Sequence, residues 1–298
     1  MSDWFFQSLQ DRSNYPLVMG ILNVTPDSFS DGGRYTSVDA AMRHGLAMHS
    51  QGAAIIDVGA ESTRPGAENV SADVQFARAI PVIQALHAAA PDAAISIDTR
   101  DARVAHVAIQ AGACLINDVS ALRDDPDMAT VAAAAGAGVV LMHRRGDART
   151  MQVGDGPVYD DVVAEVSEFL KERAGFAMAQ GIRADRIMID PGIGFGKRFE
   201  DNLRLLGAID QLVSLGFPVL IGASRKAFLG RLLEAMNARG GAAEPNDRLH
   251  GSLACAAWAM LAGAAMVRVH DVRPTVDLLA TLRAIKGRDS GPSKARHY

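Results

Sequence analysis

The chain has 298 residues, of which 49% are hydrophobic and 21% charged, and its formal net charge is -4. This length allows a large buried core, and the lack of a Lys/Arg block excludes the electrostatic pattern of proteins that bind nucleic acid or anionic membranes. Charged residues interrupt every apolar run well before the roughly 18 residues of a membrane span, and residues 1–10 lack the basic region of a secretory signal, so we expect a cytoplasmic protein with small-molecule substrates.

Eight short runs rich in Val, Ile and Leu recur along the chain, and a longer Ala-rich segment with helical spacing follows almost every one. Their nearly continuous apolar character is typical of parallel strands that are covered on both faces. Eight such strands, each followed by a helix, predict a single-domain α/β fold, the (β/α)8 TIM barrel. The predicted strands span 17–24, 54–59, 94–98, 114–119, 138–142, 186–190, 218–222 and 265–269.

Helix start signals support this register, because Ser37, Ser71 and Asp160 each precede a helical run. The mixed Gly, Ala, Pro and Asn of residues 237–247 predict two helices around a surface loop between the last two strands. We therefore expect an N-terminal extension at 1–16, the barrel at 17–286 and a flexible tail at 287–298. The two cysteines, Cys114 and Cys255, lie in apolar runs without metal-ligand spacing and are expected to be buried thiols.

Polar residues stand where nearly every predicted strand ends, which is where an α/β barrel builds its active site. Buried carboxylates and carboxamides need partners, so a ring of them around one opening predicts a polar ligand. The alternative is that individual carboxylates cap the following helices or pair with nearby cations. The set comprises Asn23, Asp57, Asp98, Asn117, Asp118, His143, Asp190, Ser224, Lys226, Arg268 and His270.

The chemistry of this set indicates a flat heterocycle beside an anion. The carboxylates of Asp98 and Asp190, with the amide of Asn117, match the edge of a ring that carries amino, N–H and carbonyl groups. The guanidinium of Arg268 can stack on the ring face or grip a phosphate. The Gly-containing loops at 31–33 and 64–66 can bring backbone N–H groups to a pyrophosphate.

Two other features are interpreted as structural. Residues 190–197, Asp-Pro-Gly-Ile-Gly-Phe-Gly-Lys, have neither the spacing of a P-loop nor that of a dinucleotide fingerprint, and predict a strand-to-helix turn. His143 has no companion at metal-ligand spacing, which favours a hydrogen-bonded structural histidine over a metal ligand or general base.

Several blocks, in order along the chain, resemble those of the dihydropteroate synthases. Residues 23–33, Asn-Val-Thr-Pro-Asp-Ser-Phe-Ser-Asp-Gly-Gly, are similar to the first signature loop of that family, and residues 57–66, Asp-Val-Gly-Ala-Glu-Ser-Thr-Arg-Pro-Gly, to the second. The turn at 190–197, the Ser-Arg-Lys triplet at 224–226 and the Arg-Val-His-Asp run at 268–271 match the remaining blocks. The resemblance spans about residues 17–285 and implies the condensation of 6-hydroxymethyl-7,8-dihydropterin pyrophosphate with p-aminobenzoate in folate biosynthesis, by a homodimeric transferase that is a sulfonamide target.

The same resemblance implies roles for individual residues. Asn23, Arg268 and His270 would hold the pyrophosphate, with Mg2+ bridging Asn23 and phosphate oxygens. Asp31 on the first loop would close over the site, and Asp31, Lys226, Arg268 and His270 are the expected catalytic residues. The residues that would hold or border the pterin are Asp98, Asn117, Met142, Asp190, Phe195, Lys226 and Arg268, and those bordering the p-aminobenzoate slot are Thr63, Arg64, Pro65 and Lys226.

Two rival functions stay open from the sequence. A methyltetrahydrofolate-dependent corrinoid methyltransferase shares the pterin-binding barrel, but the loops at 28–31 and 62–65 argue against it. A non-catalytic pterin-binding paralogue would be expected to lack Asn23, Lys226 or Arg268, and all three are present. The lack of a Ser/His/Asp or Cys/His arrangement agrees with a dissociative reaction that needs no enzyme nucleophile.

Overall fold

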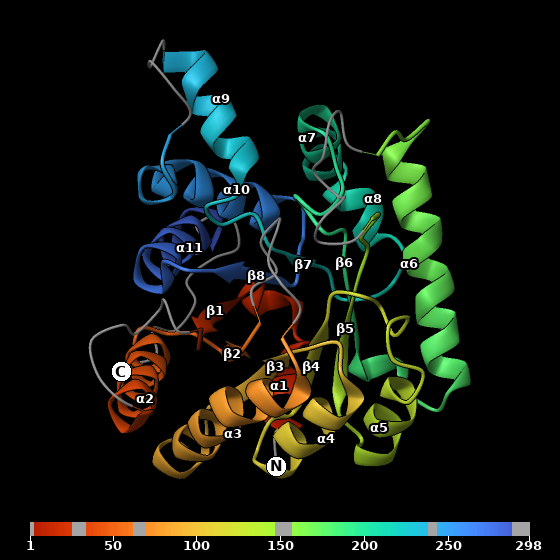
Figure 1. Ribbon diagram of the computed structural model, residues 1–298. Helices are drawn as coiled ribbons and strands as arrows, with labels where there is room; N and C mark the ends of the chain where they lie inside the picture. The colour runs from red at the N-terminus through yellow and green to blue at the C-terminus, as the bar shows by residue number, and fades with distance from the viewer. Residues whose placement is uncertain (1–2, 26–33, 62–69, 147–156, 238–242, 288–298) are drawn as a thin grey trace.

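The computed structural model describes residues 3–25, 34–61, 70–146, 157–237 and 243–287, and it confirms the barrel (Figure 1). The parallel strands form one sheet in the order β6-β5-β4-β3-β2-β1-β8-β7. A bridge between Ile189 and Val219 joins the two ends of that order, so the sheet curls round on itself. The strands are β1 Leu17–Asn23, β2 Ile55–Gly59, β3 Ala94–Asp98, β4 Leu115–Asp118, β5 Gly138–Met142, β6 Ile187–Asp190, β7 Leu220–Ile221 and β8 Met266–Val269.

All eight strands lie where the sequence predicted them, although β7 has two residues where five were expected. Pro218 has no N–H to donate to a ladder. The next residue, Val219, accepts the N–H groups of both Ala265 and Met266 at one carbonyl, so regular pairing with β8 begins only at Leu220. The seventh strand is the shortest of the eight, and the barrel closes beside it, at the bridge between Ile189 and Val219.

The helices form the outer layer of the barrel (Figure 1). The segment between β7 and β8 contains two helices, as expected, while an unpredicted extra helix lies between β6 and β7. The bounds are α2 Arg34–Ser50, α3 Ala72–Ala89, α4 Ala102–Gln110, α5 Met128–Ala135, α6 Val162–Ala179, α7 Phe199–Gly207, α8 Ile209–Val213, α9 Ala227–Asn237, α10 Leu249–Leu261 and α11 Val272–Gly287, with 3-10 turns η1 Arg12–Asn14, η3 Ala184–Arg186 and η4 Pro245–Arg248.

Of the three helix starts, one is confirmed and two are shifted. Ser71 is the N-cap residue of α3, as predicted. The helix expected after Ser37 already begins at Arg34. Asp161, and not Asp160, caps α6, because its carboxylate accepts the N–H groups of the second and third helical residues.

The N-terminal extension packs into the barrel. Helix α1, Asp3–Ser8, buries Phe5 and Phe6 against residues such as Met19 and Met188, which lie near the starts of the strands. This apolar plug fills the end of the barrel opposite to the polar rim. Polar side chains that face the interior are thereby left with one opening, at the carboxyl ends of the strands.

Three further expectations concern the periphery. In the described part of the chain, no helix has the length and apolarity that crossing a membrane requires. Cys114 and Cys255 form no disulfide, but both are half-buried rather than fully buried, and burial raises the pKa of Cys255 to about 11. Helix α11 continues to Gly287, one residue beyond the expected end, and the remainder of the expected tail, 288–298, lies outside the described residues.

Candidate active site

Four side chains from four strands form one hydrogen-bonded cluster at the barrel opening. Arg268, on β8, donates from Nε to Oδ2 of Asp57 over 2.7 Å and from Nη2 to Oδ2 of Asp98 over 2.8 Å. The Asn117 amide donates to the same Asp57 oxygen over 2.9 Å. We call Asp57, Asp98, Asn117 and Arg268 the rim cluster, and its existence confirms that these strand ends converge.

Asp57 is the member whose part the sequence did not predict. Its side chain is fully buried, and it holds both Arg268 and Asn117 through one oxygen. The other oxygen, Oδ1, has no hydrogen-bond partner in the described part of the chain. A buried carboxylate oxygen without a partner is costly, which makes it a candidate acceptor for a ligand N–H.

The charges of the rim cluster are unbalanced in favour of the carboxylates. Burial raises the pKa of Asp98 to about 7, against the attraction of Arg268, and the neighbouring Asp57 carboxylate raises it further. For Arg268, burial opposes the charge, yet Asp57 and Asp98 raise its pKa. Arg268 therefore stays cationic, while Asp98 can gain or lose a proton near neutral pH.

Asp190 and Lys226 face the same opening from β6 and from the turn after β7. A Cβ on Gly222 would lie 3.9 Å from both Oδ2 of Asp190 and Cβ of Arg268, so the Asp190 and Arg268 side chains both approach this small residue. Burial raises the pKa of Asp190 despite its hydrogen bond from the Gly192 N–H, which spans 2.7 Å. Burial also lowers the pKa of Lys226 to about 8, and Arg268 acts in the same direction.

A small group of apolar side chains lies next to Lys226. Val119, Met142 and Phe195 form a small buried cluster, which places the expected residues Met142 and Phe195 together. The Lys226 ammonium lies 4.0 Å from the centroid of the Phe195 ring, a cation–π contact. A flat ring entering here would meet an apolar side and a hydrogen-bonding edge.

His270 is held by Ser224 at the end of β8. The Ser224 oxygen accepts the main-chain N–H of His270 over 3.2 Å, and it lies 3.1 Å from the ring nitrogen Nδ1. Burial, followed by the charge of Arg268, lowers the pKa of His270 to about 4. The imidazole is therefore neutral near pH 7 and can offer a ligand a hydrogen bond but not a charge.

Asn23 ends β1 next to the rim cluster. Its Oδ1 lies 3.5 Å from where a Cβ on Gly59 would be, and the Asp98 carboxylate lies 3.8 Å from the same point. No group of three or more His, Cys, Asp or Glu that could hold a metal ion occurs in the described part of the chain. A lone carbonyl oxygen still fits Mg2+, which keeps several waters and shares its remaining ligands with substrate phosphates.

The alternative explanation holds in part, because Asp57 and Asp98 pair with Arg268, while Asp118 accepts hydrogen bonds from the backbone of the following turn. Its two oxygens accept the N–H groups of Ser120 and Leu122 over 2.7 and 2.8 Å. These bonds stabilise a loop in which Ala121 and Leu122 have positive φ angles. Asp118 therefore shapes the turn after β4 and has little capacity left for a ligand.

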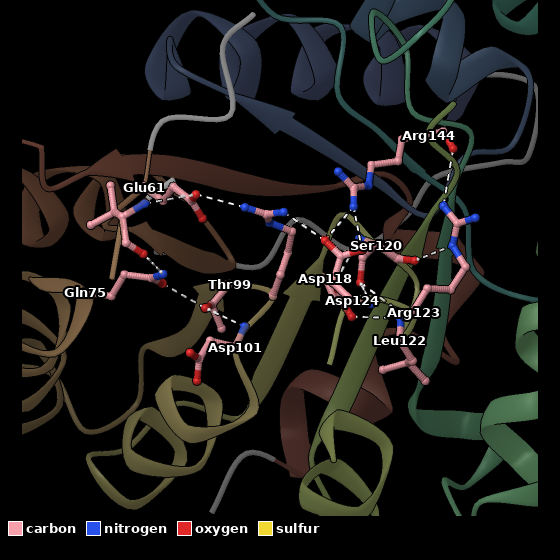
Figure 2. A network of polar contacts seen from close by, with 12 residues as sticks. Glu61, Gln75, Thr99, Asp101, Asp118, Ser120, Leu122, Arg123, Asp124 and Arg144 are labelled. Carbon is pink, nitrogen blue, oxygen red and sulfur yellow. Dashed lines mark hydrogen bonds and ion pairs between the residues drawn. The ribbon is translucent and has the colours of Figure 1, made fainter. Parts of the chain in front are cut away.

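A chain of ion pairs links the segments that follow β2, β3, β4 and β5, and no sequence pattern predicted it (Figure 2). Arg100 bonds both Glu61, over 2.9 Å, and Asp124, over 2.8 Å. Asp124 in turn accepts from Arg144 over 2.6 Å. Glu61 also accepts the Val70 N–H over 3.4 Å, so the carboxylate joins the two residues that flank 62–69.

The turn at 191–198 connects β6 to α7, as predicted, and it packs tightly on the end of β5. Gly192, Gly194 and Gly196 all have positive φ angles. A Cβ on Gly192 would overlap the His143 carbonyl oxygen, and one on Gly196 would overlap that of Arg145. These glycines are required by backbone conformation and by close approach, not by phosphate binding.

Replacing Gly192 by Ala is expected to cost about 3 kcal/mol of unfolding free energy, because the new Cβ meets backbone and the φ angle is unfavourable. Denaturant unfolding measures the loss. Gly175 in α6 is the matched control: a Cβ there meets nothing within 4 Å, so alanine should stabilise by about 0.5 kcal/mol. Equal stability of the two variants would contradict the tight packing of the turn.

Four expected site residues lie outside the described residues: Asp31, Thr63, Arg64 and Pro65. The structure therefore places neither the first loop nor the p-aminobenzoate slot. It brings together Asn23, Asp98, Asn117, Asp190, Lys226, Arg268 and His270 with Met142 and Phe195, and it adds Asp57.

Comparisons with known proteins agree with this geometry. Residues 19–270 match the family described as "Pterin binding enzyme". A dihydropteroate synthase of Mycobacterium leprae is 48% identical over 267 residues, which is 90% of this chain and 92% of the relative.

Solved structures give the same result. That of Xanthomonas albilineans dihydropteroate synthase with 4-aminobenzoic acid superposes with a TM-score of 0.83 at 46% identity and covers 92% of this chain and 94% of that one. That of Yersinia pestis dihydropteroate synthase with a sulfonamide drug complex has a TM-score of 0.83 at 41% identity, over 92% and 96% of the two chains.

Proposed function

The chain belongs to the pterin-binding enzyme family, among its dihydropteroate synthases, and from that premise we propose how its rim residues carry out the condensation. The enzyme joins a dihydropterin methyl pyrophosphate to p-aminobenzoate, and it releases 7,8-dihydropteroate and pyrophosphate. One observation carries the assignment of the site: the hydrogen-bonded rim cluster lies beside Asp190 and Lys226 at the open end of the barrel.

We propose that the pterin enters edge-on into this opening. The Asp190 carboxylate would accept from the amino and ring N–H groups, since one oxygen already takes the Gly192 N–H and the other is left for a ligand. The free Asp57 oxygen and the Asn117 amide extend the hydrogen-bonding edge. Met142 and Phe195 would pack against the apolar parts of the ring.

The leaving pyrophosphate would be gripped by Arg268 and His270. Arg268 has two of its N–H groups committed to Asp57 and Asp98, and its side chain remains 17% exposed, so further donors face the opening. His270 would donate a neutral hydrogen bond, because its lowered pKa keeps it uncharged. The positive charge on this side of the pocket would therefore come from Arg268 and not from His270.

The reaction would proceed through a cation-like transition state. The C–O bond to pyrophosphate lengthens first, the positive charge spreads into the pterin ring, and the aromatic amine then attacks the methylene carbon. Asp98 and Asp190, in their ionised forms, would stabilise the electron-poor ring. After attack the amine gives its proton to water or to the departing pyrophosphate. Because the aromatic amine is itself the nucleophile, no residue of the chain needs to act as one.

The p-aminobenzoate slot would be bordered by Thr63, Arg64 and Pro65 together with Lys226, and Asp31 would help to close it. Closure keeps water from the cation, which hydrolysis would otherwise convert to the pterin alcohol. Because sulfonamides resemble p-aminobenzoate, we expect them to compete for this slot. Ala227 follows Lys226, so the backbone rather than a hydroxyl would meet the benzoate carboxylate there.

A direct assay tests the function. The purified protein, supplied with dihydropterin methyl pyrophosphate and p-aminobenzoate, should release pyrophosphate and form dihydropteroate in equal amounts. Pyrophosphate release that does not depend on p-aminobenzoate, with pterin alcohol as the product, would contradict the proposal. Methyl transfer from methyltetrahydrofolate to a cobalamin protein would favour the rival enzyme instead.

We also propose Mg2+ as the cofactor, held by Asn23 and the pyrophosphate oxygens, where it would neutralise charge on the leaving group. Removal of divalent cations by a chelator should lower the rate about a hundredfold, and added Mg2+ should restore it. The Asn23→Ala variant should need a higher Mg2+ concentration for half-maximal rate. An unchanged Mg2+ requirement in that variant would remove Asn23 from the metal site.

We propose that the enzyme is a homodimer. Helices α7 and α10 lie side by side, and they expose Leu203, Trp258 and Leu261, which suits a homodimer through the C-terminal half. Sedimentation of the wild type as a monomer at micromolar concentration would refute this.

We further propose that residues 17–286 act as one cytoplasmic domain, with 1–16 as an extension and 287–298 as a tail.

A further inference from the structure

A buried lysine that the reaction above does not use lies behind the pterin pocket. Lys197 is 7% exposed, and its Nζ donates to the carbonyl oxygens of His143 and Phe195 over 3.2 and 3.1 Å. The third contact of Nζ is the ring nitrogen Nδ1 of His143, at 2.9 Å. All three hydrogens of the ammonium thus have an acceptor, and none of these acceptors is a carboxylate.

The free-energy cost of burying its charge indicates that Lys197 does more than fill space. Burial of an ammonium is costly, and here it lowers the pKa of Lys197 to about 7. A methionine would fill similar space without that cost, so packing alone does not explain a lysine. What the ammonium adds is a fixed link between the end of β5, at His143, and the glycine turn after β6, at Phe195.

His143 is suited to receive this bond. Burial, followed by the charge of Lys197, lowers its pKa to about 2, so the imidazole is neutral and Nδ1 can accept. The His143 ring is buried, and it meets the Phe169 ring edge-on at 4.8 Å. The main-chain N–H of His143 donates to the Asp190 carbonyl over 3.0 Å, so the acceptor group is itself tied to β6.

The link continues from Phe195 into the pocket. Lys197 holds the Phe195 carbonyl, and the Phe195 N–H is bonded to Gly192 over 3.0 Å, so the backbone on both sides of this residue is fixed. The direction of the Phe195 ring is therefore set by the turn. That ring lies 4.0 Å from the Lys226 ammonium, and the charges of Arg268 and Asp190 act on the same ammonium.

We propose that Lys197 is a positioning residue for pterin binding, which acts through Phe195 to hold the Lys226 ammonium beside Asp190. This inference rests on the proposed function, because it takes the pocket lined by Phe195 and Lys226 as the pterin site. Lys197 itself does not touch the substrate. Its removal should let the turn shift and the Phe195 ring tilt, and a misplaced binding group costs affinity.

The test separates pterin binding from p-aminobenzoate binding. Lys197→Met removes all three donors, and it should raise the Kd for dihydropterin pyrophosphate about tenfold, measured by calorimetry without p-aminobenzoate. The KM for p-aminobenzoate, measured at saturating pterin, should stay within about twofold. Lys197→Gln keeps two amide donors and should recover much of the affinity.

Two controls make the result specific. Lys171, exposed on α6, is the matched lysine, and Lys171→Met should change neither constant. Because Lys197 acts through the Phe195 ring, the Lys197→Met change should cost little more once Phe195→Leu is present, a strongly non-additive pair. If Lys197→Met does not fold at the assay temperature, the same cycle is run at a lower temperature at which all the variants are folded.

The outcomes decide the proposal. A higher Kd for pterin alone, rescue by glutamine and non-additivity with Phe195→Leu would support it. An unchanged Kd, an equal rise in both constants, or additive effects of the two substitutions would overturn it. A wild-type protein that does not bind pterin would instead contradict the proposed function, so the two failures are distinguishable.

Discussion

Replacing Arg268 by Met is expected to lower kcat/KM for the pterin pyrophosphate about a thousandfold. Its guanidinium is the only cation that an ion pair joins to the buried Asp57 and Asp98 in the described part of the chain, and the proposed reaction also uses it for the departing pyrophosphate. The substitution would remove a charge that stabilises the transition state, an effect of roughly a hundredfold or more by itself. It would also release both carboxylates and the pterin edge that they form.

The same substitution should weaken the fold. Removing one partner of a buried ion pair costs about 3 kcal/mol or more, because it leaves the other charge buried without compensation. Here Asp98 can relieve part of that cost by taking a proton, so the loss should be smaller at pH 6 than at pH 8. Denaturant unfolding at the two pH values measures the difference.

A matched arginine provides the control. Arg273 pairs with Asp277 on the surface of α11, where both side chains are more than half exposed, and Arg273→Met should leave kcat/KM within about twofold of wild type. Kinetics are compared at a temperature where each variant is folded. A loss of less than tenfold in the Arg268→Met variant would show that another group holds the pyrophosphate.

The barrel and most of the rim could be predicted because both follow from patterns local to the chain. Each strand is a short apolar run, and residues such as Asp98 and Asp190 come last in their strands, so their convergence follows from the topology. The positions of the strands could be predicted because strands covered on both faces are nearly continuous apolar runs. Such patterns can misplace a helix start by one residue, as they did for α6, whose N-cap is Asp161 and not Asp160.

What could not be predicted depends on contacts between distant segments. Asp57 was recognised as a rim residue, but nothing in the sequence says that one of its oxygens holds Arg268, 211 residues away. Lys197 was assigned to a structural turn because residues 190–197 lack the spacing of a phosphate-binding loop. Its role could not be predicted, since two of its three acceptors belong to His143, which follows another strand. Phe5 and Phe6 precede the first strand, and only the folded barrel shows the cavity that they fill.

The pH profile of kcat/KM for the pterin pyrophosphate should be a narrow bell with its maximum between pH 7 and 8. Its acid limb would come from Asp98, whose pKa burial raises to about 7. Below that pH the carboxyl is protonated, and it can no longer stabilise the electron-poor ring, so activity falls with falling pH. The basic limb would come from Lys226, whose pKa burial lowers to about 8, since it loses its charge as pH rises.

Asp98→Asn separates the two limbs. The amide keeps the shape of the carboxyl but does not titrate, so the acid limb should disappear while the basic limb remains, and the maximum should fall about a hundredfold. His270 and His143 do not produce the acid limb, because burial lowers the pKa of His270 to about 4 and that of His143 to about 2, well below the pH at which activity falls. An acid limb that persists near pH 7 in Asp98→Asn would mean that a different group, or a step other than capture of the pterin, titrates there.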